Sequence, residues 1–177
     1  LGMSTLRTNA INDVEGTTKF YDGSPTVDLW RLSANFSTDN GTITGWERPD
    51  ESSIVGVSVN GLTESSGIFT FPSTGIYHIL ITAQLENGSS SDGTMEIQMQ
   101  TSIDSGSNFT KASTLSVGDS DTGTNNGSAS QIMLNVTDAS TTQFKFLTAS
   151  INSGSFIHGQ SGFNITEFSC IKILPVQ

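Results

Sequence analysis

Hydrophobic and polar residues alternate with a period of two along most of the chain, and helical periodicity is nearly absent. The alternating region is punctuated by DNG, NG, DG and SG pairs, which are turn signals at the spacing of short antiparallel strands. Strands are predicted at residues 28–36, 52–60, 67–71, 75–85, 94–103, 130–136, 142–151 and 164–174. This pattern predicts an all-β sandwich or barrel.

The stretch GIFTFPSTGIYHILITA (67–83) interrupts a strong strand pattern with a proline and a glycine. Pro72 lacks a backbone donor and has a fixed φ, so it does not fit inside a central β-ladder. Gly75 permits backbone angles that other residues resist. The segment PSTG (72–75) is therefore predicted to be a tight corner, through which the chain leaves one sheet and joins the other.

Two of the predicted strands, 75–85 and 164–174, are apolar on both faces. A strand of an isolated sandwich should show one polar face, so a second apolar face predicts a homo-oligomer. Lys172 is the exception in this pattern, and it must reach a rim or pair with an acid. The predicted interface residues are Tyr77, Ile79, Ile81, Phe168, Ile171 and Ile173.

Composition narrows the classes of function. The 177 residues fit one domain with a sizeable core, and the formal net charge of −10 with only seven Lys and Arg argues against nucleic-acid binding. The chain shows neither a signal peptide nor an apolar run that spans a membrane. Its one cysteine, Cys170, lies in an apolar run, which predicts a buried, inert thiol and assembly in a reducing cytoplasm.

No catalytic residues are predicted. The two histidines, His78 and His158, lie outside any HExxH or GxSxG motif, and nothing among the 17 acids selects a glycosidase pair. The polar stretches 86–93 and 117–130 are predicted to be exposed loops that could serve as binding surfaces. In the second loop, Asp119, Asp121 and Asn125 alternate as in a calcium site, but no glutamate closes the loop, and a plain polar loop is the alternative.

Three aromatic residues have two interpretations each. Trp46, Phe109 and Phe156 are candidates for stacking against carbohydrate at the surface, and each fits equally well as a plug of the core.

The corner GIFTFPSTGIYHI resembles that of complement C1q-like and tumour-necrosis-factor-like (TNF-like) domains, in which one strand ends Phe-Thr-x-Pro and the next opens Gly-x-Tyr. LSANF (32–36), TITGWERPD (42–50) and TEFSCIKIL (166–174) fit the order of strands in that family. The resemblance implies a ten-stranded jelly-roll sandwich at residues 28–177. It also implies a homotrimer with the closing strands near the threefold axis. There is no Gly-x-y collagen stalk, which argues against an animal complement role.

Residues 1–27 differ from the rest and are predicted to form an N-terminal arm, with Leu1 and Gly2 as a tag remnant. MSTLRTNAINDVEGTTKF (3–20) resembles the opening of virion proteins from tailed bacteriophages, especially those of marine cyanobacteria. The resemblance implies a non-enzymatic virion protein: a capsid decoration, head fibre or tail-fibre component, attached by the arm.

Several expectations follow for partners and location. The expected partners are copies of the chain itself, capsid or tail proteins, and a host surface glycan, without nucleic acid or membrane insertion. The virion would be assembled in the host cytoplasm. The alternatives are a tail receptor-binding protein for host glycan, a cytokine-like or C1q-like recognition module, and a polysaccharide hydrolase. The hydrolase is supported only by the presence of carboxylates.

Overall fold

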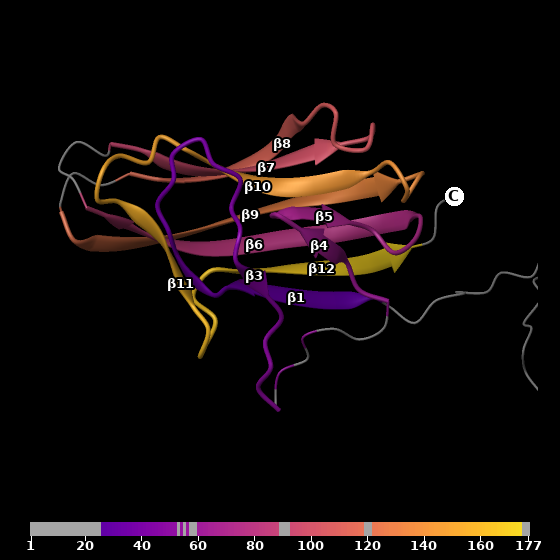
Figure 1. Cartoon of the computed structure of the whole chain (residues 1–177), viewed down its shortest axis with the longest axis horizontal. Helices are drawn as coiled ribbons and strands as arrows, with labels where there is room; N and C mark the ends of the chain where they lie inside the picture. Colours follow the sequence, from indigo (N-terminus) through magenta and orange to yellow (C-terminus); the bar gives the residue numbers. More distant parts are fainter. Residues whose placement is uncertain are drawn as a thin grey trace, which may run out of the picture.

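The computed structural model describes residues 26–52, 54, 56, 60–88, 93–118 and 122–174 (Figure 1). Within these ranges there is no helix, and twelve strands form two antiparallel sheets. One sheet contains β1 (Val27–Leu32), β2 (Ala34–Phe36), β3 (Trp46–Glu47), β6 (Gly75–Asn87), β9 (Thr124–Val136), β11 (Phe156–Gln160) and β12 (Glu167–Leu174). The other contains β4 (Thr63–Ser65), β5 (Ile68–Thr70), β7 (Met95–Ser102), β8 (Thr110–Val117) and β10 (Gln143–Ala149).

The order of strands defines a two-layer sandwich. The seven-stranded sheet runs β2-β11-β6-β12-β1-β3, with β9 paired to β6, and the five-stranded sheet runs β4-β5-β10-β7-β8. The all-β sandwich predicted from the sequence is confirmed. The described residues hold twelve strands rather than ten, partly because the segment 28–36 divides at Ser33, whose N–H donates to the Gly45 carbonyl. On either side of this break, β1 pairs with β12 and β2 pairs with β11.

The corner at 72–75 connects the two sheets, as predicted. It joins β5 of the five-stranded sheet to β6 of the seven-stranded sheet. Tyr77 Oη donates to the Ser73 carbonyl at 2.8 Å, and Lys172 Nζ reaches Ser73 Oγ at 3.0 Å. Lys172 thus ends at a rim rather than at an acid. A Cβ atom on Gly75 would lie 2.5 Å from Lys172 Cε, so the glycine lets β12 pass close to the corner.

An aromatic cluster fills the space between the sheets. Phe69 of β5 meets Phe168 of β12 edge to face, with ring centroids 4.9 Å apart, and stacks on Phe144 of β10 at 5.0 Å. Trp46 packs against the same rings and is buried, so it is a plug of the core. Cys170 is also buried, as predicted, and this burial raises the pKa of its thiol.

A buried ion pair ties the segment after β3 to β1. Asp28 of β1 is fully buried and accepts hydrogen bonds from Arg48 Nε at 2.8 Å and Arg48 Nη2 at 2.9 Å. The Leu62 N–H donates to the same carboxylate at 2.6 Å. The Arg48 guanidinium lies 4.2 Å from the centroid of the Trp30 ring. A buried carboxylate requires such partners, so this pair holds Arg48 and Leu62 against β1.

A second ionic group surrounds Arg31, whose side chain is only 2% exposed. Its guanidinium donates to Glu47, Asp50 and Glu51. Burial by itself lowers the pKa of Arg31, but the bonds to the three carboxylates outweigh it and the pKa rises. The bond from Arg31 in turn lowers the pKa of Glu51. Both groups fix the connection between β3 and β4 against β1, the first on the face of Trp30 and the second on the face of Leu29.

Several segments differ from the sequence predictions, which also did not include the short strands β3, β4 and β11. Of the predicted strand 52–60, residues 52, 54, 56 and 60 lie in turns and bends, and the others lie outside the described residues. Residues 124–130 were predicted to be a loop, but they form the first half of β9. β8 was not predicted at all. Both segments are polar, and they become strands because β9 pairs with β6 over its whole length and β8 pairs with β7.

Candidate functional site

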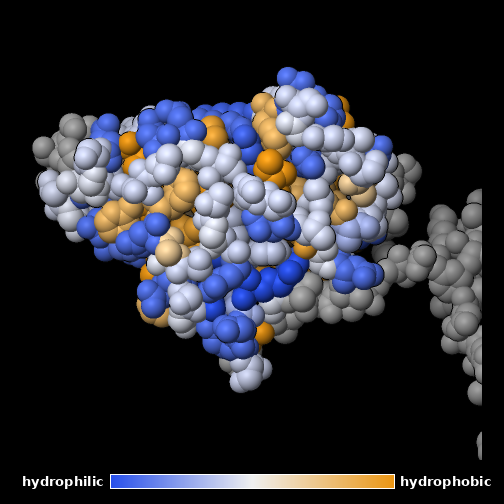
Figure 2. Space-filling model, viewed as in Figure 1, coloured by the Kyte–Doolittle hydropathy of each residue, from blue (hydrophilic) through white to orange (hydrophobic). Residues whose placement is uncertain are grey.

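The outer face of the seven-stranded sheet presents hydrophobic side chains that no other part of the described chain covers completely. Along β6, even-numbered residues point away from the core. His78 lies opposite Met133 of β9 and Ile171 of β12. The outer apolar patch is formed by Leu29, Ile76, Leu80, Met133 and Ile171, all of them at least partly exposed. In Figure 2, hydrophobic residues reach the surface in separate patches among hydrophilic ones.

The predicted interface residues divide between the two faces of the sheet. Four of them, Tyr77, Ile79, Ile81 and Phe168, lie in the core of the chain itself and are at most 1% exposed. They cannot contact a second chain, so for these four the predicted face is wrong. The first half of β6 carries apolar residues on both faces, and alternation there does not tell which face meets the other sheet. Ile171 belongs to the outer apolar patch, and Ile173 is 43% exposed.

Both histidines contact amide side chains. His78 Nε2 lies 2.7 Å from Gln131 Oε1 on the outer face of the sheet. His158 Nε2 lies 2.7 Å from Asn125 Oδ1 and 3.2 Å from Glu86 Oε2, so the imidazole links β11, β9 and β6. These contacts hold neighbouring strands together.

The predicted calcium ligands are placed only in part. Asp119 and Asp121 lie outside the described residues. Asn125 lies in β9, where its Oδ1 contacts His158. The described ranges contain no group of three His, Cys, Asp or Glu side chains that could hold a metal ion. The calcium loop stays a prediction.

The two remaining aromatic candidates are partly exposed. Lys145 Nζ lies 4.3 Å from the centroid of the Phe109 ring on the five-stranded sheet. Phe156 of β11 meets the His158 ring edge to face at 4.8 Å. Each ring thus contacts a neighbouring side chain. Phe109, Phe156 and Trp46 do not come together in one site. The described residues also contain no apolar helix of membrane-spanning length.

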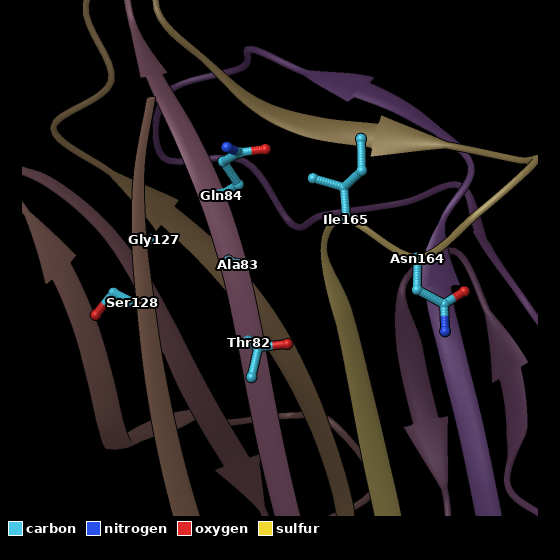
Figure 3. A pocket seen from close by; sticks show the side chains of 7 residues that line it. All are labelled: Thr82, Ala83, Gln84, Gly127, Ser128, Asn164 and Ile165. Carbon is cyan, nitrogen blue, oxygen red and sulfur yellow. The ribbon is translucent and has the colours of Figure 1, made fainter. Parts of the chain in front are cut away.

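A pocket of about 450 Å³ opens where β6 changes its neighbour (Figure 3). It is lined by Thr82, Ala83, Gln84, Gly127, Ser128, Asn164 and Ile165. Asn164 Nδ2 donates to Glu167 Oε2, while Asn164 Oδ1 is buried without a hydrogen-bond partner. This pocket could not be predicted from the sequence, because segments some 80 residues apart form it and no local motif marks it.

Comparison with known proteins supports the architecture. No protein-family model matches the chain, and no curated protein matches it. Among solved structures, the TNF protein Eiger from S. frugiperda aligns with a TM-score of 0.61 at 8% identity, covering 86% of this chain and 96% of Eiger. Murine APRIL aligns with a TM-score of 0.62 at 13% identity, covering 85% of this chain and 100% of APRIL.

These alignments define the class of the protein by its fold. The chain has a TNF-like jelly roll, as the corner and the order of strands predicted. The identities are low, so the likeness concerns the fold.

Proposed function

We propose that this protein is a non-enzymatic module that works as a homotrimer, assembled through the outer face of its seven-stranded sheet. The outer apolar patch is the observation that supports this proposal most directly. Exposed apolar surface of this kind is stabilised by association, at roughly 25 cal/mol for each Å² removed from water. The resemblance of the corner to trimeric C1q-like and TNF-like domains gives the expected number of subunits. The proposal requires no cofactor.

The module would serve as a structural protein of a tailed-phage virion, as a capsid decoration, head fibre or tail-fibre component. The support is the resemblance of residues 3–20 to the openings of such proteins. That segment lies outside the described residues, and it would attach the trimer to the particle. Repeated copies on one particle would provide avidity for a host surface. The single buried Cys170 fits assembly in a reducing host cytoplasm.

A second candidate is a recognition module that binds a protein receptor, as in cytokine-like proteins. The observation in its favour is the likeness in fold to Eiger and murine APRIL. A tail protein that binds host glycan is the third alternative. Imaging of intact virions with a gold-labelled antibody separates these candidates. Label on the head favours a decoration or head fibre, and label on the tail favours a host-binding fibre. Absence of label from the particles would contradict the virion role.

The trimer itself is tested by light scattering of the purified chain. The expected mass is three times the chain mass of 18.7 kDa. Leu80→Glu places a charge in the middle of the outer apolar patch, and burying an unpaired charge costs several kcal/mol. The variant is therefore expected to run as a folded monomer.

Leu147→Glu is the matched control for this experiment. Leu147 is a partly exposed leucine on the outer face of β10 in the other sheet. This variant should keep the trimer mass. A monomeric wild-type protein, or a Leu80→Glu variant that stays trimeric, would contradict the proposed assembly.

A further inference from the structure

The pocket arises from a gap in the pairing along one edge of β6. Thr82 is the last residue of β6 that pairs with β12, opposite Glu167, and Leu85 is the first that pairs with β11, opposite Ile157. Between them, the Gln84 N–H donates to a side chain instead of a strand, the Thr166 hydroxyl, at 3.2 Å. The connection from β11 to β12 therefore stands beside the gap rather than filling it.

The side chains around the pocket come from two directions. Figure 3 shows Thr82 and Gln84 extending from β6, with Asn164 and Ile165 on the connection before β12. The Ser128 side chain points away from them, so β9 contributes mainly backbone.

Gly127 keeps the pocket open on the side of β9. It lies directly opposite Gln84 in the ladder between β6 and β9. A Cβ atom at Gly127 would have only the Ala83 carbonyl oxygen within 4 Å, at 3.9 Å. Its φ is not among the positive ones, so the backbone does not require glycine. A larger residue would fit this strand and would fill the pocket, which makes Gly127 the natural position for a test.

Asn164 borders the pocket with a side chain that is fixed in place. Its amide nitrogen donates to Glu167, which sets the orientation of the side chain. Its Oδ1 is buried, has no hydrogen-bond partner among the described residues, and points away from Thr82 and Gln84 in Figure 3. The polar groups that a ligand can reach are therefore those of β6.

The lining selects for a neutral ligand that carries hydroxyl groups. The Thr82 hydroxyl and the Gln84 amide line the pocket together with one larger aliphatic side chain, Ile165, and none of the lining side chains is charged. A sugar ring combines hydroxyl groups at its edge with an apolar face, and the volume lies in the range of small-molecule sites. We propose that this pocket binds one neutral saccharide unit.

This site deepens the glycan-binding alternative of the proposed function and rests on it. The pocket lies on the same outer face as the outer apolar patch, further along β6 than Leu80, so the trimer must leave this end of the face uncovered. The test is saturation-transfer NMR and calorimetric titration of the full chain. The probes are methyl glycosides of neutral hexoses and N-acetylhexosamines. At least one glycoside should bind the wild-type protein. Gly127→Leu should abolish this binding, and Thr82→Val should weaken it about fivefold through loss of one hydrogen bond.

Two control variants are matched to these changes. Gly93→Leu alters a glycine outside the pocket that also has open space around its Cβ. Thr110→Val removes an exposed hydroxyl from β8 on the other sheet. Both should bind the glycoside like the wild type. Wild-type protein that binds none of the glycosides, or Gly127→Leu with wild-type affinity, would overturn the saccharide site.

The mass of each variant separates this inference from the proposed trimer. A wild-type monomer that binds a glycoside would refute the trimer and support the site. Conversely, a trimer that binds no glycoside and dissociates in Gly127→Leu would show that the pocket receives a side chain from a second copy. That result would overturn the saccharide site and leave the trimer standing.

Discussion

Arg48→Met should cost this protein a large part of its stability, because it leaves a buried carboxylate without its cation. Asp28 is 0% exposed, and after the change the Leu62 N–H is the one donor to it that remains among the described residues. Breaking a buried ion pair typically costs about 3–5 kcal/mol. The Arg48 side chain is 33% exposed, so water partly screens the pair, and the lower end of that range applies. The expected loss in free energy of unfolding is about 3 kcal/mol.

The double variant Asp28→Asn/Arg48→Met separates the loss of charge pairing from the loss of packing. Methionine keeps an apolar stem over the Trp30 ring, and the asparagine oxygen still accepts the Leu62 N–H. With no charge left in the core, the double variant should lose only about 1 kcal/mol.

Urea unfolding followed by tryptophan fluorescence measures both losses. All variants are compared at one protein concentration, because self-association adds to apparent stability. A loss below about 1 kcal/mol in Arg48→Met, or a double variant less stable than the single one, would refute the reasoning.

Three further predictions concern the corner, a loop and the thiol. Gly75→Ala brings a methyl group into the side chain of Lys172, and overpacking should lower the free energy of unfolding by about 1–3 kcal/mol in thermal melts. Hydrogen bonds from Asn108 and Ser102 lower the pKa of Asp104 to about 2. The stability from Asp104 is therefore complete above about pH 4 and lost as the pH falls toward 2, a dependence that Asp104→Asn should remove in acid titrations. Cys170 should react with a thiol reagent only after unfolding.

The first of these predictions has a control variant, and each of the other two has an outcome that would contradict it. Gly93→Ala, with open space at its Cβ, should melt like the wild type. An Asp104→Asn variant with unchanged acid sensitivity would show that other carboxylates dominate the acid transition. Rapid labelling of Cys170 in the folded protein would contradict its burial.

The period of two, the corner and the apolar run around Cys170 were sufficient to predict the fold class. Alternation is a local property of a strand, and a proline followed by a glycine ends one strand and starts the next whatever lies nearby. The corner also supplied the resemblance to TNF-like domains, which the alignment with Eiger and murine APRIL confirms for the fold.

The tertiary structure decided which face of each strand is the core. Ile76 and Tyr77 are neighbours in an apolar strand, and only the aromatic layer of the opposite sheet determines that Tyr77 points inward. The polar strands β8 and β9 likewise depend on hydrogen bonds from partners that are distant in sequence.

The pocket is the clearest example of a feature that could not be predicted from the sequence. It exists because β12 and β11 meet β6 at positions separated by a short gap, and because Gly127 happens to face that gap. A sequence determines the pattern of a strand because that pattern is local. The register between strands depends on the packing of the whole sandwich. The pocket and the identity of the exposed face follow from that register.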